Sequence, residues 1–334
     1  MTLAKLFLAT VAASSATVSA EAANVVINTQ SEESEYLRVC DAFGQGYFFI
    51  PGTETCLKLE GYSRFQVNAG PNAGGSKDYD PFVRVHVQLT ANSDTEHGPL
   101  TSVLTLRALG GRYPQTNSPR VEAAYIDIAG FRAGVFYGWW DYNLTGDTDD
   151  LFSPYSPLNS VRYQYEASGF YAGIAADRLD AYAIDRDAVG VALGTGGRGD
   201  GFRYHITGGY DTDFQEWALR ALGKVEIGVG TLGFSAVYSS NPNGYYATAG
   251  WSTAAEYSIA ATEKLLITPA IQYFGNYGAN VAKSEFRPND AWKTGVTVDY
   301  QIMDNFFAKL SLEHTEINNA DNITSGFIRF ERAF

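Results

Sequence analysis

Hydrophobic and polar residues alternate with a period of two along most of the chain after about residue 56. Leu57, Leu59, Phe65 and Val67 occupy odd positions of the first such segment, and the even positions between them are polar or charged. Successive side chains of a β-strand point to opposite faces, so this alternation predicts strands with one apolar and one polar face. Residues 82–92 repeat the pattern.

Sixteen segments of this kind divide the region 56–334. They are 56–68, 82–92, 100–108, 121–128, 131–139, 160–167, 169–177, 186–194, 203–211, 216–227, 231–239, 247–259, 264–274, 291–301, 305–316 and 324–334. The alternation is weakest in 186–194, where small residues blur the two faces. Even-numbered connections are mostly tight, such as Ala129-Gly130, with exceptions expected around 93–99 and 195–201, whereas the odd-numbered connections are longer and polar.

Short connections on one side and long loops on the other are typical of an outer-membrane barrel. A soluble β-sandwich would also alternate, but its strands are usually five or six residues long. Many segments here reach the nine to eleven residues that cross a bilayer when tilted. The sequence therefore predicts an all-β fold, a 16-stranded antiparallel transmembrane β-barrel over residues 56–334.

The two faces of such strands have different solvents. A charged side chain facing lipid is costly, so the apolar face must point outward and the charged face must line the interior. Sixteen strands enclose a lumen too wide for side chains to fill, which predicts a water-filled pore. Aromatic residues near strand ends are candidates for interfacial girdles. They are Trp139, Trp140, Tyr163, Trp217, Trp251, Tyr257, Tyr273, Trp292, Tyr300 and Phe306.

Residues 1–22 have the pattern of a secretory signal peptide, with Lys5, a short apolar run and small residues before the cleavage site. Residues 23–55 then form a short periplasmic lead ahead of the barrel. The chain has two cysteines, Cys40 and Cys56. An even, minimal cysteine count in an exported protein favours a disulfide, while free thiols or a metal site are the alternatives. Two cysteines without a nearby histidine make a poor zinc site.

The net charge of −13 disfavours nucleic acid as a partner. The four histidines lie in different segments, without a nucleophile elbow or a metal-binding spacing, so the sequence predicts no enzyme and no cofactor. The segment from Asp141 to Gly146 resembles the start of an EF-hand loop. Its twelfth position is Phe152 instead of glutamate, and no metal site is predicted.

The longest predicted loop, about 140–159, is the third on the long-loop side. It carries four carboxylates and no basic residue: Asp141, Asp147, Asp149 and Asp150. If it folds into the barrel, these carboxylates face a lumen row of cations, which are Lys58, Arg64, Arg84, Arg107, Arg132 and Arg162. Opposed charges across a narrow opening would give size exclusion and ion preference together. A solvated acidic loop on the outer surface is the alternative.

Three stretches resemble the alpha-proteobacterial general porins, which are outer-membrane trimeric porins. "YLRVCDAFGQGYFFIPGTETCLKLEGYSRFQVNAG" (36–70) is similar to the opening of the mature family members, "AYIDIAGFRAGVFYGWWD" (124–141) to the hairpin before their third loop, and "FIRFERAF" (327–334) to their closing strand. The middle of the chain resembles the family in strand rhythm alone. The chain is shorter than many relatives, so pore size is not carried over.

The resemblance implies a homotrimer in the Gram-negative outer membrane, in contact with lipid, that passes small hydrophilic solutes and ions by passive diffusion. It also implies that the third loop folds inward as the constriction and that the terminal Phe334 is read by the barrel-assembly machinery. A substrate-specific channel and a non-conducting structural or adhesive barrel are the alternative functions.

Overall fold

The computed structural model describes residues 38–71, 78–111, 119–154, 156–179, 188–280 and 284–334. The predicted signal peptide and residues 23–37 of the predicted lead lie outside these ranges. Among the described residues, no helix is long and apolar enough to cross a membrane.

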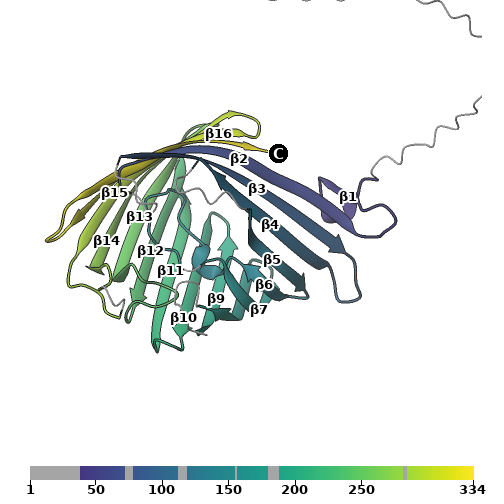
Figure 1. Cartoon of the computed structure of the whole chain (residues 1–334), viewed down its shortest axis with the longest axis horizontal. Coiled ribbons are helices and arrows are strands. Elements are labelled where there is room, and N and C mark those ends of the chain that lie inside the picture. The colour runs from purple at the N-terminus through teal and green to yellow at the C-terminus, as the bar shows by residue number, and fades with distance from the viewer. Residues whose placement is uncertain (1–37, 72–77, 112–118, 155, 180–187, 281–283) are drawn as a thin grey trace, which may run out of the picture. The chain divides into compact units, whose positions relative to one another are not determined.

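Sixteen long strands form one antiparallel sheet. They are β2 (Cys56–Ala69), β3 (Tyr79–Ser93), β4 (Leu100–Gly110), β5 (Arg120–Ile128), β6 (Phe131–Phe136), β7 (Leu158–Ala167), β8 (Phe170–Arg178), β9 (Val189–Gly199), β10 (Phe202–Asp211), β11 (Glu216–Ile227), β12 (Gly230–Ser239), β13 (Ala249–Thr262), β14 (Leu265–Tyr277), β15 (Ala291–Met303), β16 (Phe306–Ile317) and β17 (Ile323–Ala333). Each pairs with the next, and β17 pairs with β2, as Figure 1 shows for the purple and yellow strands. The predicted 16-stranded barrel is confirmed.

The alternating pattern separates the two faces of the barrel wall. Leu59 and Phe65 of β2 are 52% and 46% exposed, whereas Gln66, the residue after Phe65, is 7% exposed. The same alternation recurs in β10, where Phe202 and Ile206 are exposed and Thr207 is buried. An exposed apolar face and a polar inner face are what a lipid-embedded barrel requires.

The connection predicted to be long around residues 195–201 is in fact a tight turn. β9 continues to Gly199 and β10 starts at Phe202, so Asp200 and Gly201 alone form the turn. The prediction was wrong because the second half of β9 is rich in glycine, which usually indicates a loop. In the structure aromatic rings cover them: a Cβ at Gly196 would lie 2.5 Å from the Tyr171 ring.

The segment before the barrel carries a feature that alternation did not predict. A short strand, β1 (Tyr47–Phe49), pairs with the start of β2, after the 3₁₀ turn η1 (Asp41–Phe43). Cys40 and Cys56 form a disulfide with their Cα atoms 5.9 Å apart, which confirms that prediction. The bridge and β1 together fix this segment to the first barrel strand.

The prediction of a membrane-interface position is wrong for two of the girdle residues. Trp139 and Trp140 are 2% and 1% exposed and lie inside the protein. They follow β6, which ends at Phe136 instead of running to residue 139, and they begin the 3₁₀ turn η2 (Trp139–Asp141) that leads away from the wall. Trp217, Trp251 and Trp292 are exposed, as lipid-facing aromatics are expected to be.

Candidate functional site

The connection between β6 and β7, residues 137–157, is attached to the opposite wall of the barrel; we call it the inner loop. Its backbone amides donate to side chains of β13, β14 and β15. Gly146 N lies 2.8 Å from Glu256 Oε2, Asp147 N lies 2.9 Å from Thr297 Oγ1, and Asp150 N lies 2.8 Å from Gln272 Oε1. Since β14 is the eighth strand after β6 in a ring of sixteen, the inner loop crosses the interior.

A buried arginine on β11 holds both ends of the inner loop. Arg220 is 0% exposed, and its guanidinium donates to the carbonyl oxygens of Trp139 at 2.7 Å, Trp140 at 2.9 Å and Leu151 at 2.8 Å. These acceptors are loop carbonyls outside the strand ladder, and His205 Nε2 of β10 also lies 3.1 Å from the Trp139 carbonyl oxygen. Hydrogen bonds from a charged donor are stronger than neutral ones, so Arg220 is the central anchor of the loop.

The Trp139 ring docks on glycine. A Cβ at Gly194 of β9 would lie 2.3 Å from the ring, which is closer than real atoms approach. The indole Nε1 donates to Gln164 Oε1 at 3.0 Å, so the ring is held at its polar end as well. Glycine at position 194 therefore makes room for the Trp139 ring at the start of the inner loop.

A second connection, residues 240–248 between β12 and β13, packs against the inner loop; we call it the supporting loop. Ser153 Oγ donates to Gly244 O at 2.8 Å, and the Trp140 ring lies 6.0 Å from that of Tyr245. Tyr245 is fully buried, and its hydroxyl donates to Asp177 Oδ2 at 2.9 Å. Sequence analysis missed this loop, although two adjacent tyrosines in a connection were a signal.

The four predicted acidic residues divide into two pairs. Asp147 Oδ2 lies 2.6 Å from Lys309 Nζ, and Asp150 Oδ2 lies 3.1 Å from Lys293 Nζ. These two lysines project from β16 and β15, and neither was among the predicted cations. Asp147 and Asp150 therefore join the inner loop to the wall through charge as well as through backbone hydrogen bonds.

Asp141 and Asp149 are half-buried within the loop. Asp141 accepts hydrogen bonds from Gly138 N at 3.0 Å and from Ser156 Oγ. Burial raises its pKa to about 6. Burial, followed by the nearby Glu256 and Asp150 carboxylates, raises the pKa of Asp149 to about 7. Asp149 Oδ2 is buried without a hydrogen-bond partner among the described residues.

The six predicted cations lie on strands within the range β2–β7, and they pair or pack mainly with residues of the barrel wall. Lys58 lies 2.5 Å from Glu60, Arg64 lies 2.6 Å from Glu331, Arg132 lies 2.7 Å from Asp127, and Arg107 pairs with Glu122. Arg162 packs 5.0 Å from the Phe136 ring centre. Arg84 lies opposite Arg64 across β2 and β3. Among the described residues, none of the six forms an ion pair with an inner-loop carboxylate.

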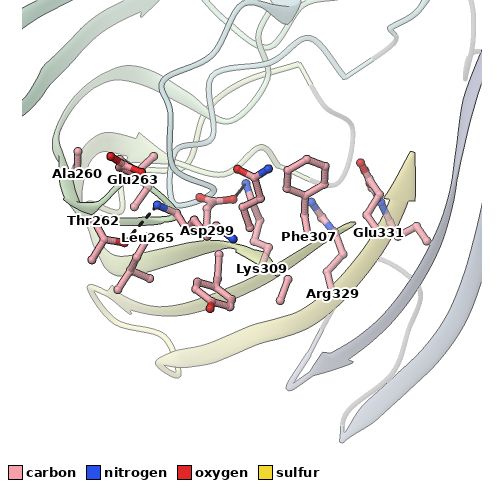
Figure 2. Close-up of a pocket in the computed structure, with 15 residues that line it drawn as sticks. Ala260, Thr262, Glu263, Leu265, Asp299, Phe307, Lys309, Arg329 and Glu331 are labelled. Carbon is pink, nitrogen blue, oxygen red and sulfur yellow. Dashed lines mark hydrogen bonds and ion pairs between the residues drawn. The ribbon is translucent and has the colours of Figure 1, made fainter. Parts of the chain in front are cut away.

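A cavity of about 500 Å³ adjoins the lysine that holds Asp147. Lys309 and Asp299, 3.2 Å apart, line one part of it, and Arg64, Arg329 and Glu331 line another. Figure 2 shows Asp299, Lys309, Arg329 and Glu331 projecting into this space. Charges of both signs thus border open space beside the inner loop.

Among the described residues, no group of three or more histidine, cysteine, aspartate or glutamate side chains is arranged to hold a metal ion.

The sequence profile of the Porin subfamily matches residues 24–331. The chain belongs to the porin family. It is 45% identical to outer membrane protein IIIA of Rhizobium leguminosarum bv. viciae, over 98% of this chain and 93% of that protein. It is 30% identical to porin Omp2b of Brucella neotomae, over the full length of both. The chain is thus an outer-membrane porin, as the resemblance to alpha-proteobacterial porins predicted.

Solved porin structures share the fold at low identity. A loop-deletion mutant of OmpT from Vibrio cholerae matches with a TM-score of 0.65 and 11% identity, over 84% of this porin and 100% of that chain. A mutant of Rh. blastica porin matches with a TM-score of 0.61 and 14% identity, over 83% and 100%. These likenesses show the barrel fold alone.

Proposed function

We infer that this porin is a passive diffusion pore for small hydrophilic solutes and ions, narrowed by the inner loop. The observation that carries the proposal is the path of the loop from β6 to its anchors on β13–β15. A loop held across the lumen leaves open space on one side of it, and solutes then move through that space down their gradients.

The narrowest part lies between the inner loop and the wall formed by β16, β17, β2 and β3. Asp147 lies on the loop side, and Lys309, Arg64 and Arg329 lie on the wall side, where they line the adjoining cavity. Arg84 lies opposite Arg64 on the neighbouring strand. Charges of opposite sign that face each other across a narrow opening orient water and select by size and charge. Asp150 belongs to the same loop surface, whereas the half-buried Asp141 and Asp149 act by holding the loop.

Lys58, Arg107, Arg132 and Arg162 have a smaller part in this proposal. Each is paired with a carboxylate of the wall or packed on an aromatic ring, and none contacts the inner loop through an ion pair among the described residues. They line the approaches to the constriction instead of forming it.

The proposed partners follow from the family. Three copies form a trimer in the outer membrane, and Phe334 is the residue that the barrel-assembly machinery reads. Phe334 extends the pairing of β17 through hydrogen bonds with Gly61, and its side chain is 59% exposed. Residues 1–22 serve as the signal peptide, and residues 23–55 form a periplasmic lead clamped by the disulfide.

Purified protein in planar bilayers and in liposomes tests the proposed function. We expect ohmic single channels, liposome swelling that slows steadily as the sugar used becomes larger, and no sugar or amino acid that blocks current at micromolar concentration. A barrel that inserts without conducting would contradict the proposal. A micromolar block by one solute would establish the substrate-specific alternative.

A further inference from the structure

A second cavity of about 530 Å³ lies on the inner wall, away from the one in Figure 2. Lumen-facing side chains of β7–β11 line it from the wall, and Tyr142 and Asn143 of the inner loop line it from above. Gly169, in the tight β7–β8 turn, also borders it. The cavity therefore opens toward the side of the barrel with the short turns, which in outer-membrane barrels is the periplasmic side.

Three cations stand side by side in this cavity; we call them the cationic row. Arg203 of β10 lies directly opposite Arg198 of β9 and directly opposite Lys224 of β11. Like charges at directly opposite positions of neighbouring strands destabilise a sheet. The row is therefore an arrangement that strand pairing alone disfavours.

Within the described part of the chain, no carboxylate forms an ion pair with the cationic row. Among the described residues, the side chains of Arg198 and Arg203 form no hydrogen bond and no ion pair, and Lys224 donates to the neutral Thr145 Oγ1 at 3.0 Å. Of the described residues that line the cavity, Glu166 is the one carboxylate, and it accepts a hydrogen bond from Gln164 at 2.6 Å. Five other cations of the inner wall do have carboxylate partners, namely Arg64, Arg107, Arg132, Lys293 and Lys309.

We propose that this cavity is a binding site for a small phosphate-type anion, held by the guanidinium groups of Arg198 and Arg203 and the ammonium group of Lys224. A guanidinium presents parallel N–H donors that match the oxygens of phosphate, and a doubly charged anion removes the repulsion within the row. The inner loop shields one side of the site, because Tyr142 and Asn143 border it.

The site deepens the proposed pore, on which it rests for solute access. It places an anion-binding step on the periplasmic side of the constriction, where a phosphate or a small phosphate ester would pause during passage. Binding itself requires only the folded barrel, so it can be measured without any current.

Equilibrium dialysis of radiolabelled inorganic phosphate with detergent-solubilised protein, at constant ionic strength, tests the proposal. We expect saturable binding by the wild type and a loss of at least tenfold in affinity for Arg203→Gln. Arg287→Gln, an exposed arginine in the β14–β15 loop on the other side of the barrel, is the matched control and should bind like the wild type.

Arg203→Gln removes a repulsive charge, so this variant should fold; Arg198→Gln provides a second test with the same expected loss. Wild type that shows no saturable binding, or glutamine variants that bind phosphate as the wild type does, would overturn the site. Chloride current through the same preparations reports the pore separately, because a conducting channel without phosphate binding contradicts this proposal and leaves the proposed function intact.

Discussion

Lys309 Nζ lies 2.6 Å from Asp147 Oδ2, and this ion pair joins residues 162 positions apart in the chain. The same ammonium group lies 3.2 Å from Asp299 Oδ1, so it sits between a loop carboxylate and a wall carboxylate. Lys309 also borders the cavity that Arg64 and Arg329 line. It therefore connects the position of the inner loop with the charge of the space beside it.

Arg220→Met should release the inner loop without dissolving the barrel. The substitution leaves three loop carbonyls, those of Trp139, Trp140 and Leu151, without their charged donor. Each buried carbonyl left without its donor costs about 1–3 kcal/mol, and this cost falls on the docking of the loop. We expect noisier and larger single-channel currents than those of the wild type.

Arg332→Met is the control for that experiment, since this exposed arginine of β17 also donates to two carbonyl oxygens but contacts no part of the inner loop. Equal channel noise in Arg220→Met and Arg332→Met would show that Arg220 does not hold the loop.

Gly194→Ala should destabilise the folded porin by about 1–3 kcal/mol, because the new Cβ would overlap the Trp139 ring and force it to move. Gly208→Ala, on the neighbouring strand β10, is a matched control, since its nearest atom would be 3.8 Å away. Unfolding midpoints in denaturant give the comparison. Equal midpoints for the two variants would contradict the close contact between Gly194 and Trp139.

Docking of the inner loop should weaken as the pH rises from about 4 to about 7. The pKa of Asp149 is raised to about 7 in the folded protein, so the folded state holds its proton more tightly than the unfolded state does. Stability from this group is greatest at acid pH and is lost as the carboxyl ionises. Asp149→Asn should therefore raise the thermal midpoint at pH 8 and change it little at pH 4.

Asp304→Asn, in the exposed β15–β16 turn, controls for the change of net charge. If the Asp149→Asn effect were the same at both pH values, ionisation of Asp149 would not be its cause.

Replacing both bridged cysteines, Cys40→Ser with Cys56→Ser, should leave the barrel and its conductance intact. The disulfide joins the lead to Cys56, the first residue of β2, whose pairing with Asn92 of β3 is made by the backbone and not by the bridge. Loss of its loop-closing effect costs about 3 kcal/mol in the chain-entropy estimate. We expect easier proteolysis of the lead and normal single-channel currents; a variant that fails to assemble would make the bridge essential to the barrel.

The barrel was predictable because lipid and water impose opposite demands on alternate residues, as at Phe65 and Gln66. The partners of the inner loop were not, since the contacts of Asp147 with Lys309 and of Asp150 with Lys293 depend on how far the loop reaches across the ring. The sequence analysis placed Trp139 and Trp140 at the membrane surface because a tryptophan near a strand end looks the same in the sequence whether it faces the membrane interface or the barrel interior. The interior position depends on residues that are distant in the chain, such as Gly194, which makes room for the Trp139 ring, and Arg220, which binds the two tryptophan carbonyls.

The central claim, that the inner loop and the facing arginines form the constriction, is tested most directly by the reversal potential of Asp147→Asn in a planar bilayer under a salt gradient. Removing this carboxylate shifts the balance of charge beside the open space toward the cations that line it, Lys309, Arg64 and Arg329. We predict a reversal potential shifted toward that of anions, relative to the wild type. An unchanged reversal potential would contradict the account.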